Sequence, residues 1–293
     1  MAGGAMRDHV LITGAGSGIG LATARALAAR GDRLLLVLRP GAPDPPGPWP
    51  ADTLVLRCDL ARPPQIRALA GDLAAIAPRI DVVLANAAVQ PWRRILTPEG
   101  LELGFATGVL GTYCLIEAVR PFLARAPSPR IVVTGSLVHR WGRYDLPGLF
   151  RGEPFDPNAT YFATKLAQLQ LVTAFARALR AERVAVHALE PGMTRTAFAR
   201  HFRGVFRLMA WLWRPFMRAP EAVAQDFAAL IARDDLLALT GTTWHRGRPR
   251  PAAAAALDAV AAEHLVAGLR GLLAGPAGTA PGSRAEAAAP RPA

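Results

Sequence analysis

Short apolar runs alternate with amphipathic stretches along most of the chain. Bounded by Gly, Pro or charged residues, the runs indicate buried strands at residues 9–13, 33–38, 53–57, 81–85, 130–134, 184–189 and 239–244. Apolar positions at steps of three and four predict helices at residues 19–29, 64–77, 99–124, 158–182, 220–232 and 252–273. This alternation favours an α/β fold, a doubly wound sheet of about seven parallel strands in the order 3-2-1-4-5-6-7.

The chain departs from this alternation in two places. Residues 39–50 hold six prolines and cannot form a normal crossover helix, so we expect a loop there. Residues 274–293 are mostly Ala, Pro and Gly, which predicts a disordered tail after a C-terminal helix at residues 251–273. Residues 1–250 are then expected to form a single domain.

Composition narrows the class of protein. A chain of 293 residues that is 52% apolar can bury a sizeable core. The start has no apolar run of signal-peptide length, and no later segment reaches about 18 uncharged apolar residues, so we expect a soluble, cytoplasmic protein. Cys58 and Cys114 lie far apart without metal-ligand spacing, and we interpret them as buried thiols with no metal site.

The net charge of +12 raises the question of nucleic acid. The arginines are spread along the chain, with no dense run, zinc-finger spacing or aromatic RNA-binding motif. We therefore expect no specific nucleic-acid binding. Weak peripheral contact with an anionic membrane surface or an acidic partner fits this charge better.

One basic residue stands apart, because Lys165 is the only lysine among 34 Lys and Arg residues. An ammonium is a compact donor whose pKa can move, whereas arginine supplies a fixed charge. Tyr161 precedes Lys165 by four residues in a predicted helix, which places both side chains on one face. The ammonium can then stabilise the phenolate, and the pair becomes a candidate for acid–base chemistry.

A glycine-rich loop lies between the first predicted strand and its helix. Glycines at this place let the turn tighten, let the backbone approach a pyrophosphate and let the helix pack closely. The candidate phosphate-binding residues are Gly14, Ser17, Gly18, Ile19 and Gly20. Where an NAD-selective site carries an acid, at the end of the second strand, this chain has Arg39, which favours NADP(H) over NAD(H).

With these motifs, Asn86-Ala87-Ala88 after the fourth strand and Ser136 after the fifth, the chain resembles the short-chain dehydrogenase/reductase family. The resemblance covers roughly residues 9–250 and implies a Rossmann-type fold. The segments VVTGSLVHRWGRYDLPGL and TGTTWHRGRP look most like its retinol-dehydrogenase and WW-domain-oxidoreductase branch.

The resemblance implies roles for single residues. Tyr161 would give a proton to a carbonyl oxygen, Lys165 would lower the pKa of Tyr161 and hold the nicotinamide ribose, and Ser136 would orient the substrate. Further implied cofactor contacts are Asp59, Leu60, Asn86, Ala87, Pro191, Gly192 and Thr194. Two of these residues have structural alternatives, Ser136 as a turn residue at the strand end and Asp59 as a helix N-cap. Asn86 can bond the backbone of adjacent strands alongside its cofactor contact.

The family pattern is broken at one position. Gly108 stands where the family has an asparagine that helps hold water near the lysine. Either an additional water fills the space at Gly108, or Thr107 or Thr112 replaces the asparagine. The resemblance also implies a substrate lid at about residues 195–220 and a homo-oligomer formed through the fourth and fifth helices. The apolar, aromatic composition of the lid suggests a hydrophobic carbonyl or alcohol as substrate.

Two function classes follow. The first is an NADP(H)-dependent oxidoreductase that acts on a hydrophobic carbonyl or alcohol. The second is a regulatory protein that keeps the short-chain dehydrogenase/reductase fold and senses NADP(H) with little or no turnover. The loss of the asparagine at Gly108 would support this second class. A serine hydrolase is excluded because Ser136 lacks a G-x-S-x-G elbow. We interpret His139 as a polar surface residue and His187 as a hydrogen-bonded core histidine.

Overall fold

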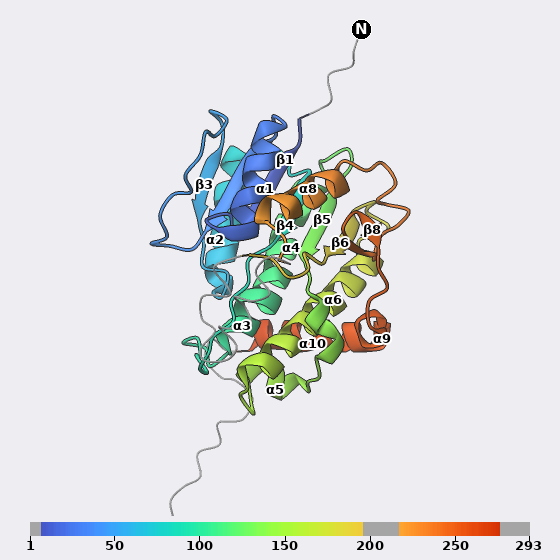
Figure 1. Ribbon diagram of the computed structural model, residues 1–293. Coiled ribbons are helices and arrows are strands. Elements are labelled where there is room, and N and C mark those ends of the chain that lie inside the picture. Colours follow the sequence, from blue (N-terminus) through green and yellow to red (C-terminus); the bar gives the residue numbers. More distant parts are fainter. Residues whose placement is uncertain (1–6, 196–216, 276–293) are drawn as a thin grey trace, which may run out of the picture.

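The computed structural model describes residues 7–195 and 217–275, and an eight-stranded sheet forms its centre (Figure 1). The strands are β1 (His9–Thr13), β2 (Arg33–Leu38), β3 (Leu54–Arg57), β4 (Val82–Ala85), β5 (Arg130–Thr134), β6 (Ala185–Leu189), β7 (Thr243–His245) and β8 (Arg248–Pro249). Their order is β3-β2-β1-β4-β5-β6-β7-β8. The predicted order of parallel strands is confirmed, and the two-residue β8 adds one antiparallel pairing with β7.

Helices cover both faces of the sheet, which gives three layers. The elements are α1 (Gly18–Ala29), α2 (Pro63–Ile76), α3 (Leu103–Phe105), α4 (Gly111–Leu123), α5 (Leu146–Arg151), α6 (Pro157–Ala178), α8 (Pro220–Ile231), α9 (Ala254–Leu257) and α10 (Ala259–Ala274), with a π-helical turn η1 (Ala106–Leu110) and a 3-10 turn η2 (Leu137–Trp141). Helices α1 and α8 pack together on one face, and α2, α4 and α6 cover the other (Figure 1). None of the described helices combines the length and apolar character needed to cross a membrane.

The connection from β2 to β3 is a loop, as its prolines predict. Side-chain hydrogen bonds hold it where a crossover helix would otherwise pack. The indole nitrogen of Trp49 donates to the carbonyl of Pro45 at 2.9 Å, and the guanidinium groups of Arg25 and Arg57 donate to loop carbonyls at 2.7 and 2.6 Å. These bonds therefore fix a loop, in place of a helix, after the carboxyl end of β2.

Two predicted helices differ in the structure. The helix expected at residues 99–124 begins at Leu103 and passes through the π-helical turn before α4. The helix expected at residues 252–273 is divided at Asp258, whose carboxylate accepts the backbone N–H groups of Val260 and Ala261 and so starts α10. Most of the predicted lid (196–216) and tail (276–293) lie outside the described residues.

The C-terminal helix α10 packs on α6. Its buried residues Leu265 and Leu269 belong to the same core cluster as α4 and α6. The Arg270 guanidinium donates to the hydroxyl of Tyr113 on α4 at 3.2 Å. This face of the α4–α6 pair is therefore covered by the chain's own C-terminal segment.

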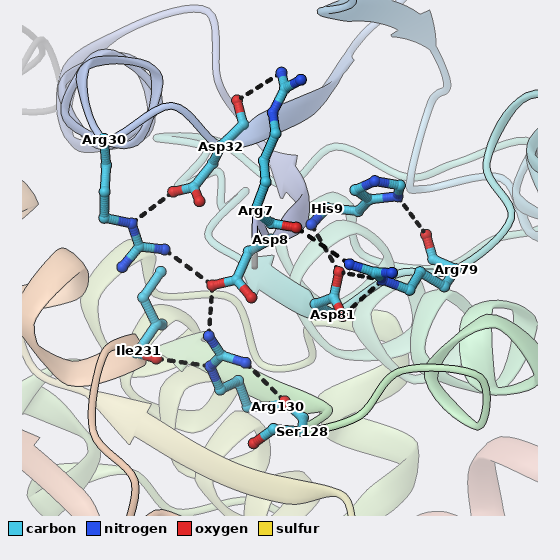
Figure 2. Close-up of polar contacts among 10 residues, drawn as sticks. All are labelled: Arg7, Asp8, His9, Arg30, Asp32, Arg79, Asp81, Ser128, Arg130 and Ile231. Carbon is cyan, nitrogen blue, oxygen red and sulfur yellow. Dashed lines mark hydrogen bonds and ion pairs between the residues drawn. The ribbon is translucent and has the colours of Figure 1, made fainter. Parts of the chain in front are cut away.

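At the amino ends of the strands, an ion network joins several segments (Figure 2). Buried Asp81 accepts the backbone N–H of His9 at 2.8 Å and the guanidinium of Arg79 at 3.0 Å. Arg130 donates to the carbonyls of Ile231 and Ser128, both at 2.7 Å, and also to the carboxylate of Asp8. Arginines in this network therefore tie β1, β4 and β5 to the end of α8 with directional bonds.

Candidate active site

Most of the predicted site residues follow the carboxyl ends of strands of the sheet, and Tyr161 and Lys165 are on α6. Asn86, just after β4, bonds to the strands on either side: its side-chain amide donates to Thr13 O at 3.2 Å and accepts from Thr134 Oγ1 at 3.1 Å. The backbone N–H groups of Asn86 and Ala87 both donate to Thr13 Oγ1 at 3.0 Å. The predicted strand-bonding role of Asn86 is confirmed, and it fixes the edge on which the site is built.

The glycine loop leads into α1 beside this edge. Gly14 has φ +67°, and Gly18 has φ +54°, conformations that favour glycine. At Gly20 a Cβ atom would stand 2.2 Å from Gly14 O and 2.7 Å from Asn86 Nδ2, so the helix start can pack here only as glycine. Close packing of this kind is what the motif predicts.

The N-terminus of α1 has the character of an anion site. Its N-cap Ser17 makes no side-chain capping bond, and no acidic residue stands in the first turn. The first N–H groups of a helix lack intrahelical partners, and the macrodipole favours negative charge beside them. Ile19 packs into the core cluster below and anchors this turn. The residues present therefore fit a phosphate-bearing cofactor.

Tyr161 and Ser136 lie together over this edge. Ser136 follows β5 as the N-cap of η2, and Tyr161 is in the first part of α6. A hydrogen bond joins their side chains and lowers the pKa of the phenol, but burial outweighs it and raises the pKa of Tyr161 to about 12. The phenol is therefore protonated at neutral pH, and its pKa lies above the usual value, whereas the resemblance implies a lowered one.

Lys165 lies one helical turn beyond Tyr161 and is buried. Its Nζ donates to Thr134 O at 3.0 Å and stands 5.7 Å from the centroid of the Tyr161 ring. Burial lowers the pKa of Lys165 to about 8, because desolvation disfavours the cation. The lysine therefore titrates close to physiological pH, as arginine in this place would not.

The other predicted cofactor residues have varied surroundings. Asp59 accepts the N–H of Ala61 at 3.0 Å in a local turn, so its predicted N-cap role is wrong because Arg62 takes the N-cap of α2. Leu60 is buried, and its carbonyl would lie 2.4 Å from a Cβ at Gly111, which explains a glycine in α4. Arg39 is exposed just after β2.

The segment after β6 forms the far side of the site. Pro191 is buried, Gly192 has φ +72°, and the Thr194 hydroxyl donates to Gly192 O at 3.2 Å. A parallel backbone bridge joins Thr194 to Arg218. The three residues implied by the resemblance thus lie in one tight turn beside β7.

Gly108 is in the π-helical turn, where it faces α6. Gln168 Nε2 donates to Gly108 O at 2.7 Å, and a Cβ at Gly108 would lie 3.3 Å from Gln168 Nε2 and from Thr164 Cγ2. Gln168 therefore fills the space beside Gly108. The sequence analysis did not single out this glutamine. Its position three residues after Lys165 was the available signal.

A small cavity of about 10 Å³, the size of one water molecule, lies beside Tyr161. Glu102 and Thr164 also line it. The Glu102 side chain caps α3 by accepting the N–H of Phe105 at 2.7 Å, and burial raises the pKa of this carboxyl group. The sequence pattern did not identify Glu102, because its burial results from tertiary packing.

The two interpreted histidines have different outcomes. His187 is a core residue, as predicted, with Nε2 3.0 Å from Leu236 O and Nδ1 accepting the Trp244 indole N–H at 3.2 Å. The surface interpretation of His139 is wrong: it is 1% exposed, because the segment before α9 folds over it. The thiol of Cys58 is buried, whereas Cys114 is only half-buried.

Comparison with known proteins agrees with this geometry. Residues 8–204 match the family model described as short chain dehydrogenase. Retinol dehydrogenase 14 of Mus musculus is 29% identical over 79% of this chain and 75% of its own length. The "Probable oxidoreductase" of Streptomyces lividans is 31% identical over 88% of this chain and 94% of its own length.

Solved structures share the architecture. A short chain dehydrogenase from Shigella flexneri, complexed with NADP, superposes with a TM-score of 0.63 at 22% identity. The match covers 82% of this chain and 97% of the other. At this identity the likeness concerns the fold. The family match and the curated relatives show that the chain belongs to the short chain dehydrogenase family, in its retinol dehydrogenase branch.

Proposed function

We propose that this protein is an NADP(H)-dependent oxidoreductase that transfers hydride between the nicotinamide and a hydrophobic carbonyl or alcohol. The observation that carries the proposal is the arrangement of three side chains: the phenol of Tyr161 hydrogen-bonded to Ser136, with Lys165 buried one turn below. This arrangement supplies a proton donor, a second hydrogen-bond donor and a cation around one reacting oxygen.

The cofactor would be held by residues on the same edge of the sheet. The glycine loop and the N-terminus of α1 would bind its phosphates, and the turn at Pro191, Gly192 and Thr194 would lie against the nicotinamide. When bound, the nicotinamide supplies or accepts the hydride. The remaining proposed contacts are Arg39, Asp59, Leu60, Asn86 and Ala87.

The chain's own groups would handle the proton. In reduction, Tyr161 Oη donates its proton to the developing alkoxide, and the Ser136 hydroxyl donates a hydrogen bond to the same oxygen. The Lys165 cation then stabilises the phenolate that remains. In oxidation the same atoms act in reverse, and Tyr161 accepts the proton of the alcohol.

Apolar side chains beside the site support a hydrophobic substrate. Trp141 is 60% exposed and packs against Phe162, next to Tyr161, with ring centroids 6.0 Å apart. Met193 in the β6 turn is 55% exposed. Large apolar side chains exposed around a polar centre are typical of ligand sites, and retinol dehydrogenase relatives are consistent with an apolar alcohol or aldehyde.

The test is a titration of purified protein with NADPH and NADH by fluorescence, followed by NADPH oxidation with a panel of apolar aldehydes and ketones. We expect tight NADPH binding and turnover. Tight binding without turnover would favour the NADP(H)-sensing alternative, and no binding of either nucleotide would contradict both.

The matched variant is Tyr161→Phe, which removes only the hydroxyl group. We expect its Kd for NADPH to stay within about twofold, while kcat falls by roughly 100-fold or more because the proton donor is lost. Full activity in this variant would exclude Tyr161 as the acid.

A further inference from the structure

A buried histidine and a buried carboxylate lie directly behind Ser136. His139 is in the turn that Ser136 begins, and Glu190 follows β6 immediately before Pro191. Each is 1% exposed, and His139 Nδ1 lies 3.1 Å from Glu190 Oε1. Residues 51 positions apart in the sequence thus meet between the proposed substrate-orienting serine and the proposed nicotinamide turn.

The contacts of the His139 ring define its tautomer. The backbone N–H of Ala253 donates to Nε2 at 3.0 Å, so Nε2 carries no proton and Nδ1 carries one. Nδ1 is 2.7 Å from Ser136 O, to which it donates. The imidazole is therefore a bridge that holds the backbone of Ser136 against the segment before α9.

Glu190 is placed to favour that tautomer. Its Oε1 faces the protonated Nδ1, and Arg250 Nη1 lies 3.5 Å from Oε2. Its backbone carbonyl lies 2.9 Å from His245 Nδ1, which links the same residue to β7. Among the described residues neither carboxylate oxygen accepts a hydrogen bond of good geometry, so burying this group costs stability.

We propose that Glu190 and His139 are positioning residues that fix the backbone, and so the hydroxyl, of Ser136 relative to the Pro191–Gly192 turn. The proposal rests on the function proposed above, in which Ser136 orients the substrate. His139 is not a general base, because its Nε2 is occupied by Ala253 and its Nδ1 by Ser136 O. The pair acts through Ser136 rather than on the substrate.

Two replacements of His139 separate positioning from burial. In His139→Asn the amide nitrogen lies as many bonds from Cα as Nδ1 does, so it can still donate to Ser136 O. In His139→Gln the amide group lies at the distance of Nε2, so it retains the Ala253 contact and loses the Ser136 bond. Glu190→Gln keeps the shape of Glu190 and removes its charge.

The measurements are kcat and KM for carbonyl reduction, Kd for NADPH, and Tm. We expect kcat to fall about tenfold or more in His139→Gln and Glu190→Gln, with Kd for NADPH within about twofold, because small misplacements of a catalytic group are costly. His139→Asn should retain kcat within about threefold. Glu190→Gln should keep the wild-type Tm or exceed it, since it removes a buried charge.

His187→Gln is the control, because His187 is equally buried, lies on β6 three residues before Glu190 and is outside the proposed site. Its Tm should fall while kcat changes less than twofold. Equal losses of kcat in His139→Asn and His139→Gln would overturn the proposal. A fall of kcat that tracks the fall of Tm across all the variants, His187→Gln included, would also overturn it. So would nitrogen NMR shifts that place the proton of His139 on Nε2. A wild-type protein without turnover would instead refute the proposed function, and the positioning role with it.

Discussion

At the scale of single residues, burial sets the chemistry of the two side chains on α6. Tyr161 and Lys165 are both desolvated, so the pKa of the acid rises to about 12 and that of the cation falls to about 8. In the proposed reduction, the protonated phenol supplies the proton, and the ammonium, which titrates near neutrality, stabilises the phenolate. Arginine in the place of Lys165 would remain charged at every relevant pH.

The titration of Lys165 gives a pH prediction. Its lowered pKa means that the cation is present below about pH 8 and is lost as pH rises through that value. We expect kcat/KM for reduction to fall above about pH 8, since this ratio reports the free enzyme. Lys165→Arg should be slower at pH 7 by about tenfold or more yet show no such fall up to pH 10. A wild-type rate in this variant, or an unchanged pH limb, would disprove the role of Lys165.

Arg39 gives a prediction about cofactor choice. Its exposed side chain follows β2, where a 2′-phosphate on the ribose would meet it. Arg39→Ala should raise Kd for NADPH by about tenfold and leave Kd for NADH within about twofold, because only NADPH carries that phosphate. Titration of both nucleotides checks this, and equal losses would remove the case for NADP(H).

At the scale of elements, periodicity predicted the sheet better than the helices around the site. Parallel strands are buried on both faces, so their apolar runs are continuous, and three of them were predicted to the residue. The π-helical turn at Gly108 depends on packing against Gln168, and the break at Asp258 depends on a capping carboxylate. An apolar pattern carries no information about either.

The site shows the same division. The positions of Ser136 after β5 and of Tyr161 and Lys165 on one face of α6 could be predicted from short motifs. His139 and Glu190 could not, because their contact is made by packing between segments distant in the sequence. The pKa of Tyr161 also differs from the motif's implication because burial is a tertiary property.

The glycine loop provides a prediction for one element. A Cβ at Gly20 would meet Gly14 O at 2.2 Å, so Gly20→Ala must displace the loop or the start of α1. We expect Kd for NADPH to rise by more than tenfold and Tm to fall. Gly71→Ala is the control: a Cβ there meets nothing within 4 Å in the exposed part of α2, and the variant should gain about 0.5–1 kcal/mol of stability. Unchanged NADPH binding in Gly20→Ala would contradict the close packing.

At the scale of the whole molecule, stability and chemistry lie at opposite ends of the sheet. The carboxyl ends hold the candidate site, with a glycine loop at positive φ and buried titratable groups. The amino ends hold the network of Figure 2, in which arginine and aspartate side chains bond to several strands and helix ends. Changes at the amino ends should therefore alter folding without altering catalysis.

Arg130 is the residue that tests this separation. It is 8% exposed and donates from three separate nitrogens to Ile231 O, Ser128 O and Asp8, acceptors that the single ammonium nitrogen of a lysine cannot span. Arg130→Lys should lower the free energy of unfolding by about 2 kcal/mol, because buried carbonyls lose their donors, while kcat and Kd for NADPH stay within about twofold. Arg177→Lys is matched on the surface, where its side chain is 61% exposed beside Glu263, and should cost less than about 0.5 kcal/mol. Urea unfolding measures the change in stability, and steady-state kinetics measure kcat. A loss of turnover in Arg130→Lys under conditions where the variant is fully folded would show that the amino and carboxyl ends of the sheet are coupled.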